Sequence, residues 1–362
     1  MQVYQVGGSV RDQLLGRPHS QADRDWVVVG ATPEQMVALG FRPVGRDFPV
    51  FLHPQTHEEY ALARTERKTA PGYRGFVVHA APDVTLEQDL QRRDLTINAM
   101  AIDESGKLVD PFDGQRDLRD RVLRHVGPKF IEDPVRILRL ARFAARFSDF
   151  GVAPETMALA RSIVQRGEAD ALVPERAWQE VARGLMEARP SRMLQVLSEC
   201  GLLQRWGAPL DSRPEDLLAV DRAAARDLPL AARFAVLGCA LPSPELFDHL
   251  LDKLRADHDS AQLGRLLLQL GGGLQQAAGP LEQLQLLERA DSIRRPERFE
   301  LLLAAFETRT GLPADSWRAA LAAVRGVDAG AIAARHEDPA AIARAVHQAR
   351  LERLTRLADA GR

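Results

Sequence analysis

Two carboxylates near the N-terminus have the spacing of a metal site. Asp23 and Asp25 flank Arg24 and lead directly into residues 26–29, a Trp-Val-Val-Val segment typical of a β-strand. In an extended chain residues two apart project to the same face, so the two carboxylates converge and Arg24 points away. Paired carboxylate oxygens suit Mg²⁺, which could activate an attacking hydroxyl and neutralise a leaving pyrophosphate.

A glycine pair precedes these acids. Gly7-Gly8-Ser9 follows the predicted strand Val3–Val6 and enters an apolar-periodic segment, so the backbone amides there could hold a triphosphate. Alone, a glycine pair after a strand is a tight turn in most proteins, and an isolated Asp-x-Asp is usually a surface turn. The two features together favour a phosphate and metal site.

Composition excludes several other classes of protein. The chain has 362 residues, of which 45% are hydrophobic and 27% charged, so global disorder and fibrous folds are excluded. No apolar run approaches a membrane span. The only cysteines are Cys200 and Cys239, too few for a disulfide framework or a cysteine metal cage. We therefore expect a reducing, cytoplasmic location.

Positive charge is concentrated in one segment although the net charge is −2. Residues 116–146 contain nine Lys or Arg and four Asp or Glu. Such a segment could neutralise several phosphates of a nucleic acid, although a solvated helix face has the same composition.

The elements that must position these residues change in type along the chain. The first 125 residues mix predicted strands, including Trp26–Val29 and Glu59–Ala63, with a short helix at Pro33–Leu39 that Thr32 caps. From Glu132 onward the apolar residues recur at spacings of three and four, which predicts helices to the end of the chain.

Several motifs in series resemble one family. Gly-Ser, 13 residues and then Asp-x-Asp is the signature of polymerase-β-like nucleotidyltransferases, and later motifs are similar to those of bacterial class II tRNA nucleotidyltransferases, the CCA-adding enzymes. The similarity spans roughly residues 1–200. The motifs concerned are Gly45-Arg46-Asp47-Phe48, His57-Glu58-Glu59-Tyr60, Arg92-Arg93-Asp94-Leu95-Thr96-Ile97-Asn98-Ala99 and Glu132-Asp133-Pro134-Val135-Arg136.

The resemblance implies a fold and a function. The expected fold is α+β: a polymerase-β-like head with a small mixed sheet and helices, followed by an all-α neck, body and tail. We expect a catalytic head at 1–125, a nucleotide-selecting neck at 126–200 and a body and tail for tRNA at 201–362. The expected activity is Mg²⁺-dependent addition of CCA to tRNA from CTP and ATP without a template. No membrane or DNA is expected as a partner.

The resemblance also assigns roles to individual residues. Asp23 and Asp25 would be catalytic and hold the metal, and the remaining residues would bind nucleotide. The latter are Gly8, Arg11, Arg93, Asp133, Arg136, Arg139 and Arg142. Glu59 could add a supporting carboxylate, but its neighbour Glu58 is a rival.

Asp133 and Arg136 are suited to choosing the base. Cytosine and adenine share an exocyclic amino donor beside a ring-nitrogen acceptor, whereas guanine and uracil present the opposite pattern. A carboxylate and a guanidinium three residues apart at the start of a predicted helix could therefore accept C and A and reject G and U. The alternative is an ordinary surface ion pair between them.

Two further segments distinguish this chain from other members of the superfamily. Residues 65–75 are predicted to be a mobile loop of the kind that CC-adding relatives have lost, although an ordinary hairpin connection is the alternative. Many relatives also carry a His-Asp phosphohydrolase motif, where this chain has Cys239 and Ala240. The competing functions are a bacterial poly(A) polymerase, which commonly has a basic C-terminal extension, and a non-catalytic tRNA-binding factor.

Overall fold

The computed structural model divides the chain into two compact units, each with its own core. The first unit comprises Met1–Gly184 and Arg192–Arg205, and the second comprises Leu185–Ser191 and Trp206–Arg362. The structure describes residues 1–17, 24–44, 50–68, 76–209, 214–277 and 279–360.

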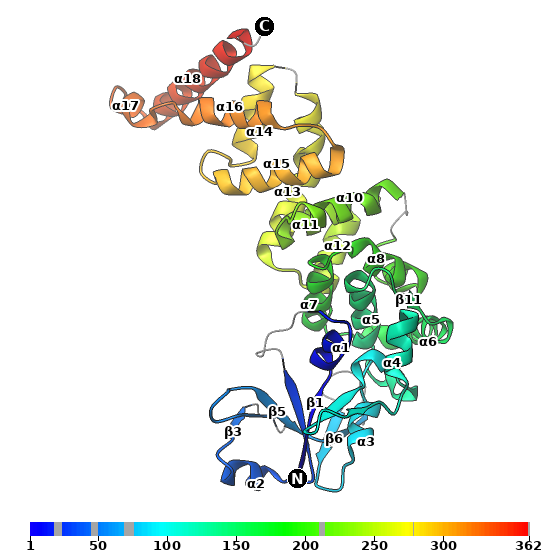
Figure 1. Cartoon of the computed structure of the whole chain (residues 1–362). Coiled ribbons are helices and arrows are strands. Elements are labelled where there is room, and N and C mark those ends of the chain that lie inside the picture. The colour runs from blue at the N-terminus through cyan, green and yellow to red at the C-terminus, as the bar shows by residue number, and fades with distance from the viewer. Residues whose placement is uncertain (18–23, 45–49, 69–75, 210–213, 278, 361–362) are drawn as a thin grey trace. The chain divides into compact units, whose positions relative to one another are not determined.

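The first unit is built around a mixed seven-stranded sheet (Figure 1). Its order is β3 (Arg42–Val44), β4 (Val50–Leu52), β5 (Glu59–Leu62), β2 (Asp25–Val29), β1 (Gln2–Val6), β8 (Ala101–Asp103) and β9 (Leu108–Val109). β2 runs antiparallel to β1 and parallel to β5. The strands predicted near Val3, Trp26 and Glu59 are confirmed to within one residue at each end.

Alternation along β2 gives this sheet two apolar faces. Val27 packs in one core cluster with Leu90 of α3 (Leu86–Gln91). Val28 packs in the opposite cluster with Met36 of α2 (Pro33–Ala38). Because successive strand residues point to opposite faces, the position of Asp25 on the first of these faces is set by Val27.

Two helices of the sheet layer begin at capping boxes. The Thr32 hydroxyl accepts from the Gln35 backbone N–H, and the Gln35 side chain accepts from the Thr32 N–H. Thr85 and Gln88 repeat this arrangement at the start of α3. Each box satisfies two backbone donors that a helix start leaves unpaired, so it fixes where the helix begins. The predicted helix Pro33–Leu39 is confirmed to within one residue.

The first part of the segment predicted as a mobile loop is a β-strand. Arg64–Lys68 is strand β6, paired antiparallel with β7 (Phe76–Ala80), so residues 65–68 belong to a hairpin. The rest of the predicted loop, residues 69–75, lies outside the described residues, as does the motif at 45–48.

Helices dominate the chain after the sheet, as predicted. The elements that follow α3 in the first unit are η3 (Thr96–Asn98), α4 (Gly114–Asp120), β10 (Val122–Leu123), η4 (Pro128–Glu132), α5 (Val135–Arg146), β11 (Gly151–Val152), α6 (Pro154–Gln165), η5 (Glu168–Ala171), α7 (Pro174–Leu185), α8 (Pro190–Glu199) and α9 (Leu202–Arg205), with β8 and β9 between η3 and α4. One exception to the predicted helical run is β11, which pairs with β10 in a two-residue parallel ladder.

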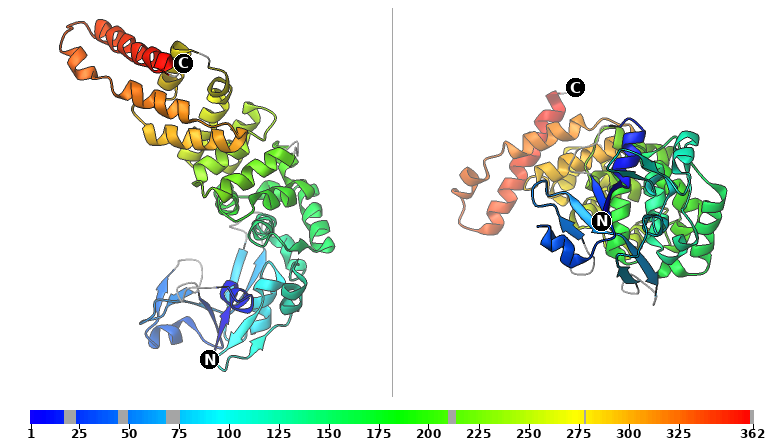
Figure 2. Two further views of the ribbon diagram at one scale, coloured as in Figure 1. Left: turned by 45° about the horizontal axis from the view of Figure 1, so that its top comes forward. Right: turned by 60° about the horizontal axis from the view of Figure 1, so that its bottom comes forward.

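The described part of the second unit consists of helices (Figures 1 and 2). α11 (Leu230–Gly238) packs against α10 (Pro214–Ala225), α13 (His258–Gln276) and α15 (Pro296–Thr310). Further along, α18 (Pro339–Ala360) packs against α14 (Pro280–Arg289) and α16 (Asp315–Arg325). The remaining helices are α12 (Pro244–Leu254) and α17 (Ala329–Ala333). Among all described helices, none combines the length and the apolarity that crossing a membrane requires.

Close approach of α4 to η3 requires a glycine. A Cβ at Gly114 would lie 2.4 Å from the Thr96 carbonyl oxygen and 2.9 Å from Met100 Cγ. Because the first of these is a backbone atom, it cannot move aside as a side chain can. Gly114 therefore sets the distance at which η3, which carries Asn98, is held.

We expect Gly114→Ala to lower the thermal unfolding midpoint, by an overpacking cost of about 1–3 kcal/mol. Gly151→Ala is the matched control, because no described atom lies within 4 Å of its Cβ position. Circular dichroism melts of the two variants and the parent chain measure the difference. Equal midpoints for the two variants would show that the contact between α4 and η3 can relax.

Candidate active site

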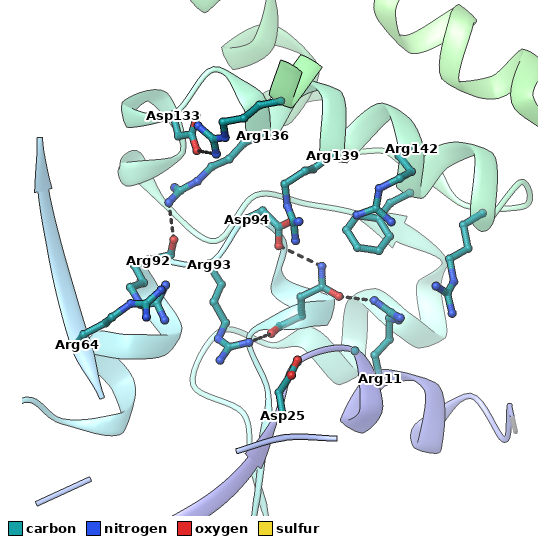
Figure 3. A pocket seen from close by; sticks show the side chains of 16 residues that line it. Arg11, Asp25, Arg64, Arg92, Arg93, Asp94, Asp133, Arg136, Arg139 and Arg142 are labelled. Atoms are coloured by element: carbon teal, nitrogen blue, oxygen red, sulfur yellow. Dashed lines mark hydrogen bonds and ion pairs between the residues drawn. The ribbon is translucent and has the colours of Figure 1, made fainter. Parts of the chain in front are cut away.

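A cavity of about 510 Å³ in the first unit collects most of the predicted site residues (Figure 3). Nine of its sixteen lining residues are arginines. The lining residues are Gly7, Gly8, Arg11, Asp25, Arg64, Arg92, Arg93, Asp94, Asn98, Asp133, Arg136, Arg139, Arg142, Phe143, Arg146 and Arg176. Every residue assigned from the sequence is among them except Asp23, which lies outside the described residues.

Asp25 occupies one edge of the cavity, at the start of β2. In the sheet register it pairs with Glu59 of the parallel strand β5, so the two side chains lie on the same face. On the opposite face Trp26 stacks on Tyr60, with ring centroids 5.5 Å apart. Glu58 instead accepts a 2.8 Å hydrogen bond from the Thr56 hydroxyl. The register therefore favours Glu59 over Glu58 as the second carboxylate of this edge.

The chemistry of this edge fits a divalent cation. Asp25 and Glu59 supply carboxylate oxygens on neighbouring strands, which are the donors that Mg²⁺ prefers. Among the described residues no group of three His, Cys, Asp or Glu is close enough to hold a metal. Since Asp23 lies outside those residues, the carboxylate pair predicted from the sequence stays a prediction.

Gly7 lets a cation and a carboxylate approach the backbone at the start of α1 (Gly8–Leu14). Its φ of +74° lies in the left-handed region, which favours glycine. A Cβ at this position would lie 2.9 Å from Arg93 Nη1 and 3.8 Å from Asp25 Oδ2. Gly7 therefore lets Arg93 and Asp25 approach the same point of the backbone, a role beyond that of a tight turn.

Arg11 is buried in the cavity wall with its donors directed at two neighbours. Nε and Nη2 donate to the carboxylate of Asp12 at 2.9 and 3.0 Å, and Nη1 donates to Asn98 Oδ1 at 2.5 Å. Its guanidinium also lies over the rings of Phe143 and Phe147. Burial lowers the pKa of Arg11 and Asp12 opposes that shift. These contacts attach α1 to α5, and direct binding of triphosphate by Arg11 stays a prediction.

Arg93 is held in the site by two long hydrogen bonds. Nη1 and Nη2 donate to the Asn98 carbonyl and to Asp89 at 3.4 Å each, near the limit for a hydrogen bond. Nε is buried and has no hydrogen-bond partner among the described residues. A buried donor without a partner is costly, so Arg93 is suited to binding an anionic ligand.

Asp94 and Arg139 form a fixed pair in the middle of the cavity. Arg139 Nε donates to Asp94 Oδ2 at 2.6 Å, and Asn98 donates to Oδ1 at 3.0 Å. Burial alone would raise the pKa of Asp94, but the Arg139 guanidinium, together with hydrogen bonds from Asn98 and the Leu95 N–H, holds this pKa well below the usual range. In return, the carboxylate raises the pKa of Arg139. Both groups are charged over the whole physiological pH range.

Asp133 and Arg136 lie in the cavity but are held by other partners than expected. Asp133 precedes α5 rather than lying within it, and it accepts from Arg176 Nη2 at 2.9 Å. Arg136 donates to the carbonyls of Lys129 and Arg92 at 2.6 and 2.5 Å. Arg136 lies in the first turn of α5, as expected, whereas the expectation that Asp133 also starts this helix is corrected, because Pro134 is the N-cap.

The sequence reading missed the contribution of α7. Arg176 binds Asp133, and the buried Glu180 accepts from Arg142 Nε at 2.6 Å. The four-residue spacing places both on one side of α7, facing the arginines of α5. A signal was present, since Glu180 falls on the apolar stripe that includes Ala177 and is an acid where a core residue is expected.

Comparisons with known proteins agree with this geometry. Residues 3–124 match the family described as the poly A polymerase head domain. The CCA-adding enzyme of Bordetella bronchiseptica is 57% identical over 98% of this chain and 96% of its own length. A multifunctional CCA protein of Burkholderia multivorans is 52% identical over the whole of both chains.

A solved structure extends the likeness to the fold. The Bacillus stearothermophilus CCA-adding enzyme in complex with CTP has a TM-score of 0.70 and 25% identity, covering 97% of this chain and 88% of its own. Both the head sheet and the helical second half therefore have counterparts there. Because a relative is 57% identical over nearly the full length, the chain belongs to the family of CCA-adding enzymes.

Proposed function

We propose that this chain adds CCA to the 3′ end of tRNA, using CTP and ATP and no nucleic-acid template. The observation that carries the proposal is the cavity, in which nine arginines surround a space bounded on one side by the carboxylate edge of β2. Such a site suits a nucleoside triphosphate and the RNA end that attacks it. Relatives at 52–57% identity bear the name of this activity. We further propose Mg²⁺ as the metal and the cytoplasm as the location.

In the proposed reaction the 3′-hydroxyl oxygen of the RNA bonds to the α-phosphorus of the nucleotide. The bond from that phosphorus to the β-phosphate oxygen breaks, pyrophosphate leaves and the hydroxyl loses its proton. Asp25 with Asp23, supported by Glu59, would hold the metal. A bound Mg²⁺ would lower the pKa of the hydroxyl and neutralise charge on the leaving group. Arg93, whose partly exposed side chain lines the cavity, would bind the phosphates.

Asp133 and Arg136 would choose the base. A carboxylate offers about four acceptor positions, and Asp133 uses some of them for Arg176 and for the Val135 N–H. Arg176 fixes the orientation of the carboxylate, and the carbonyls of Lys129 and Arg92 fix that of Arg136. The remaining acceptor and donor positions would face the exocyclic amino group and the ring nitrogen shared by C and A. Arg139 and Arg142 would bind the same nucleotide.

The domain roles follow from this proposal. Residues 1–125 would be the catalytic head, 126–200 the neck that selects the nucleotide, and 201–362 the body and tail that bind tRNA. A poly(A) polymerase would share the head, since the matching head family is named for it, but the full-length relatives reported above are CCA proteins. A non-catalytic tRNA-binding factor would have no use for a carboxylate edge facing a phosphate-binding cavity.

The wild-type protein should extend tRNA that ends at the discriminator base by CCA when supplied with Mg²⁺, CTP and ATP, and Asp25→Asn should abolish incorporation. The physical reason is loss of a metal-binding charge, so tRNA binding should persist. Labelled nucleotide incorporation on denaturing gels and filter binding of tRNA measure the two effects.

Glu58→Gln is the matched control for the carboxylate edge and should leave incorporation unchanged, whereas Glu59→Gln should reduce it. Near-normal incorporation by Asp25→Asn would overturn the metal assignment. Extension with A alone would favour a poly(A) polymerase, and binding without extension by the wild type would favour the non-catalytic factor.

Asp133→Ala and Arg136→Ala should each reduce the preference for CTP and ATP over UTP and GTP. Each removes one charge-assisted hydrogen bond to the base, so the change in relative kcat/KM should correspond to about 1.5–3 kcal/mol. The control is Asp149→Ala, which removes an acid from an exposed ion pair with Arg121. Equal loss of activity toward all four nucleotides would show that the two residues have a structural role only.

The protein should lack metal-dependent phosphohydrolase activity. Burial raises the pKa of the Cys239 thiol to about 11, and Ala240 offers no ligand. The Burkholderia relative aligns over 414 positions, so at least 52 of them have no residue in this 362-residue chain. Hydrolysis of 2′,3′-cyclic AMP with added Ni²⁺ or Mn²⁺ is the measurement. Robust hydrolysis that copurifies with the protein would contradict the expectation.

A further inference from the structure

One fully buried carboxylate outside the cavity wall holds three residues that line it. Asp89 of α3 has no exposed surface. Its Oδ1 accepts from Arg92 Nε at 3.0 Å and from the backbone N–H of Arg64 at 3.3 Å, and its Oδ2 accepts from Arg93 Nη2 at 3.4 Å. The carboxylate remains ionised because Arg92 and Arg93 lower its pKa against the opposing effect of burial. Asp89 therefore contributes a permanent negative charge behind the cavity.

Arg93 lies between two carboxylates. Burial lowers its pKa and Arg92 lowers it further, whereas Asp89 and Asp25 both raise it. Arg93 Nη1 and Asp25 Oδ2 both lie within 4 Å of the position that a Cβ would take at Gly7. Without Asp89, Arg92 would repel Arg93 and Asp25 would be the main carboxylate attracting it. Arg93 would then move toward the acid that is proposed to hold the metal.

We propose that Asp89 is a positioning residue of the nucleotide site. It directs Arg92 and Arg93 into the cavity and keeps Arg93 from closing onto Asp25, so that the cation remains available for phosphate and the carboxylate for metal. The inference rests on the proposed function, because it assigns nucleotide phosphates as the ligand of Arg93.

The same carboxylate also connects the arginine pair to the hairpin. Arg64 is the first residue of β6, and its backbone N–H donates to the oxygen that holds Arg92. The end of α3 and the start of β6 are therefore fixed relative to each other by one acceptor. A change at Asp89 displaces two walls of the cavity together.

The sign of the effect separates positioning from simple electrostatics. Asp89→Asn removes one negative charge near an anion site, so Coulomb attraction alone would tighten binding of a triphosphate. Loss of positioning instead weakens binding, because the guanidiniums are no longer held in place. We expect the dissociation constant for CTP, measured in EDTA without tRNA, to rise about tenfold, the scale of one charge-assisted hydrogen bond. The KM for CTP in the Mg²⁺ reaction should rise similarly, with a smaller change in kcat.

Asp117→Asn is the matched control. Asp117 is a second buried acid of the first unit, and it accepts from the Thr96 hydroxyl at 2.6 Å and from Arg124 Nε at 3.2 Å. It does not line the cavity. Substitution there should lower the thermal midpoint while leaving the dissociation constant for CTP unchanged.

Two further variants extend the test: one keeps the charge of residue 89, and the other removes Arg93 together with that charge. Asp89→Glu retains the charge and should bind CTP with an affinity between those of the wild type and Asp89→Asn; it also serves if the asparagine variant does not fold. In an Asp89→Asn, Arg93→Gln double variant, the loss of binding should be smaller than the sum of the two single losses, because the part that acts through Arg93 is already removed. The inference would be overturned if folded Asp89→Asn bound CTP as tightly as the wild type or more tightly. Additive losses in the double variant would also overturn it. If Asp89→Asn does not fold, wild-type affinity in Asp89→Glu would have the same consequence. Failure of the wild type to extend tRNA while these binding results hold would overturn the proposed function alone.

Discussion

Nine guanidiniums line one cavity of the first unit, and their mutual repulsion is the constraint on which the rest of the site depends. Like charges at such distances repel, and burial removes the water that would screen them. The repulsion is offset by carboxylates that each accept from one or two of these arginines. Four of these acids are buried, namely Asp12, Asp89, Asp94 and Glu180. The fifth, Asp133, is partly exposed and lines the cavity. Every pairing leaves part of a guanidinium surface facing the cavity.

This arrangement explains why elements far apart in sequence meet at the site. Asp12 of α1 accepts from Arg146 at the end of α5, and Asp94 accepts from Arg139 in the middle of that helix. Glu180 of α7 holds Arg142. Buried ion pairs contribute little net stability, because desolvation offsets most of the attraction. Their value here lies in orientation, since each fixes the direction of a planar guanidinium.

The two sides of the cavity are suited to different parts of a nucleotide. The β2 edge carries carboxylates on strands whose register is set by apolar neighbours such as Val27, and rigid strands hold metal ligands well. The side formed by α5 carries cations, with the carboxylate of Asp133 just before the helix, and is suited to phosphate and to the polar edge of a base. Arg93 lines the cavity where the two sides meet and keeps part of its side chain exposed. Its guanidinium is therefore placed to contact a phosphate that bridges the two sides.

The sequence by itself determined the local features of this protein. Three such features are the strand around Trp26, the cap at Thr32 and the helical second half. Each is caused by residues within a few positions of one another, so it can be recognised in the sequence alone. The motif residues were also identifiable, because metal and phosphate chemistry requires particular side chains at particular spacings.

Only the tertiary structure decided which charges pair. Arg136 lies three residues after Asp133, and an ion pair between the two was one expectation from the sequence. In the structure Asp133 instead binds Arg176, 43 positions later. Arg11 meets Asn98 across 87 positions. Charged side chains attract without regard to sequence distance and every arginine is chemically alike, so a sequence with 48 Lys and Arg allows many pairings of similar energy. The tertiary packing of the first unit brings particular pairs within contact distance, and that packing is a property of the folded chain.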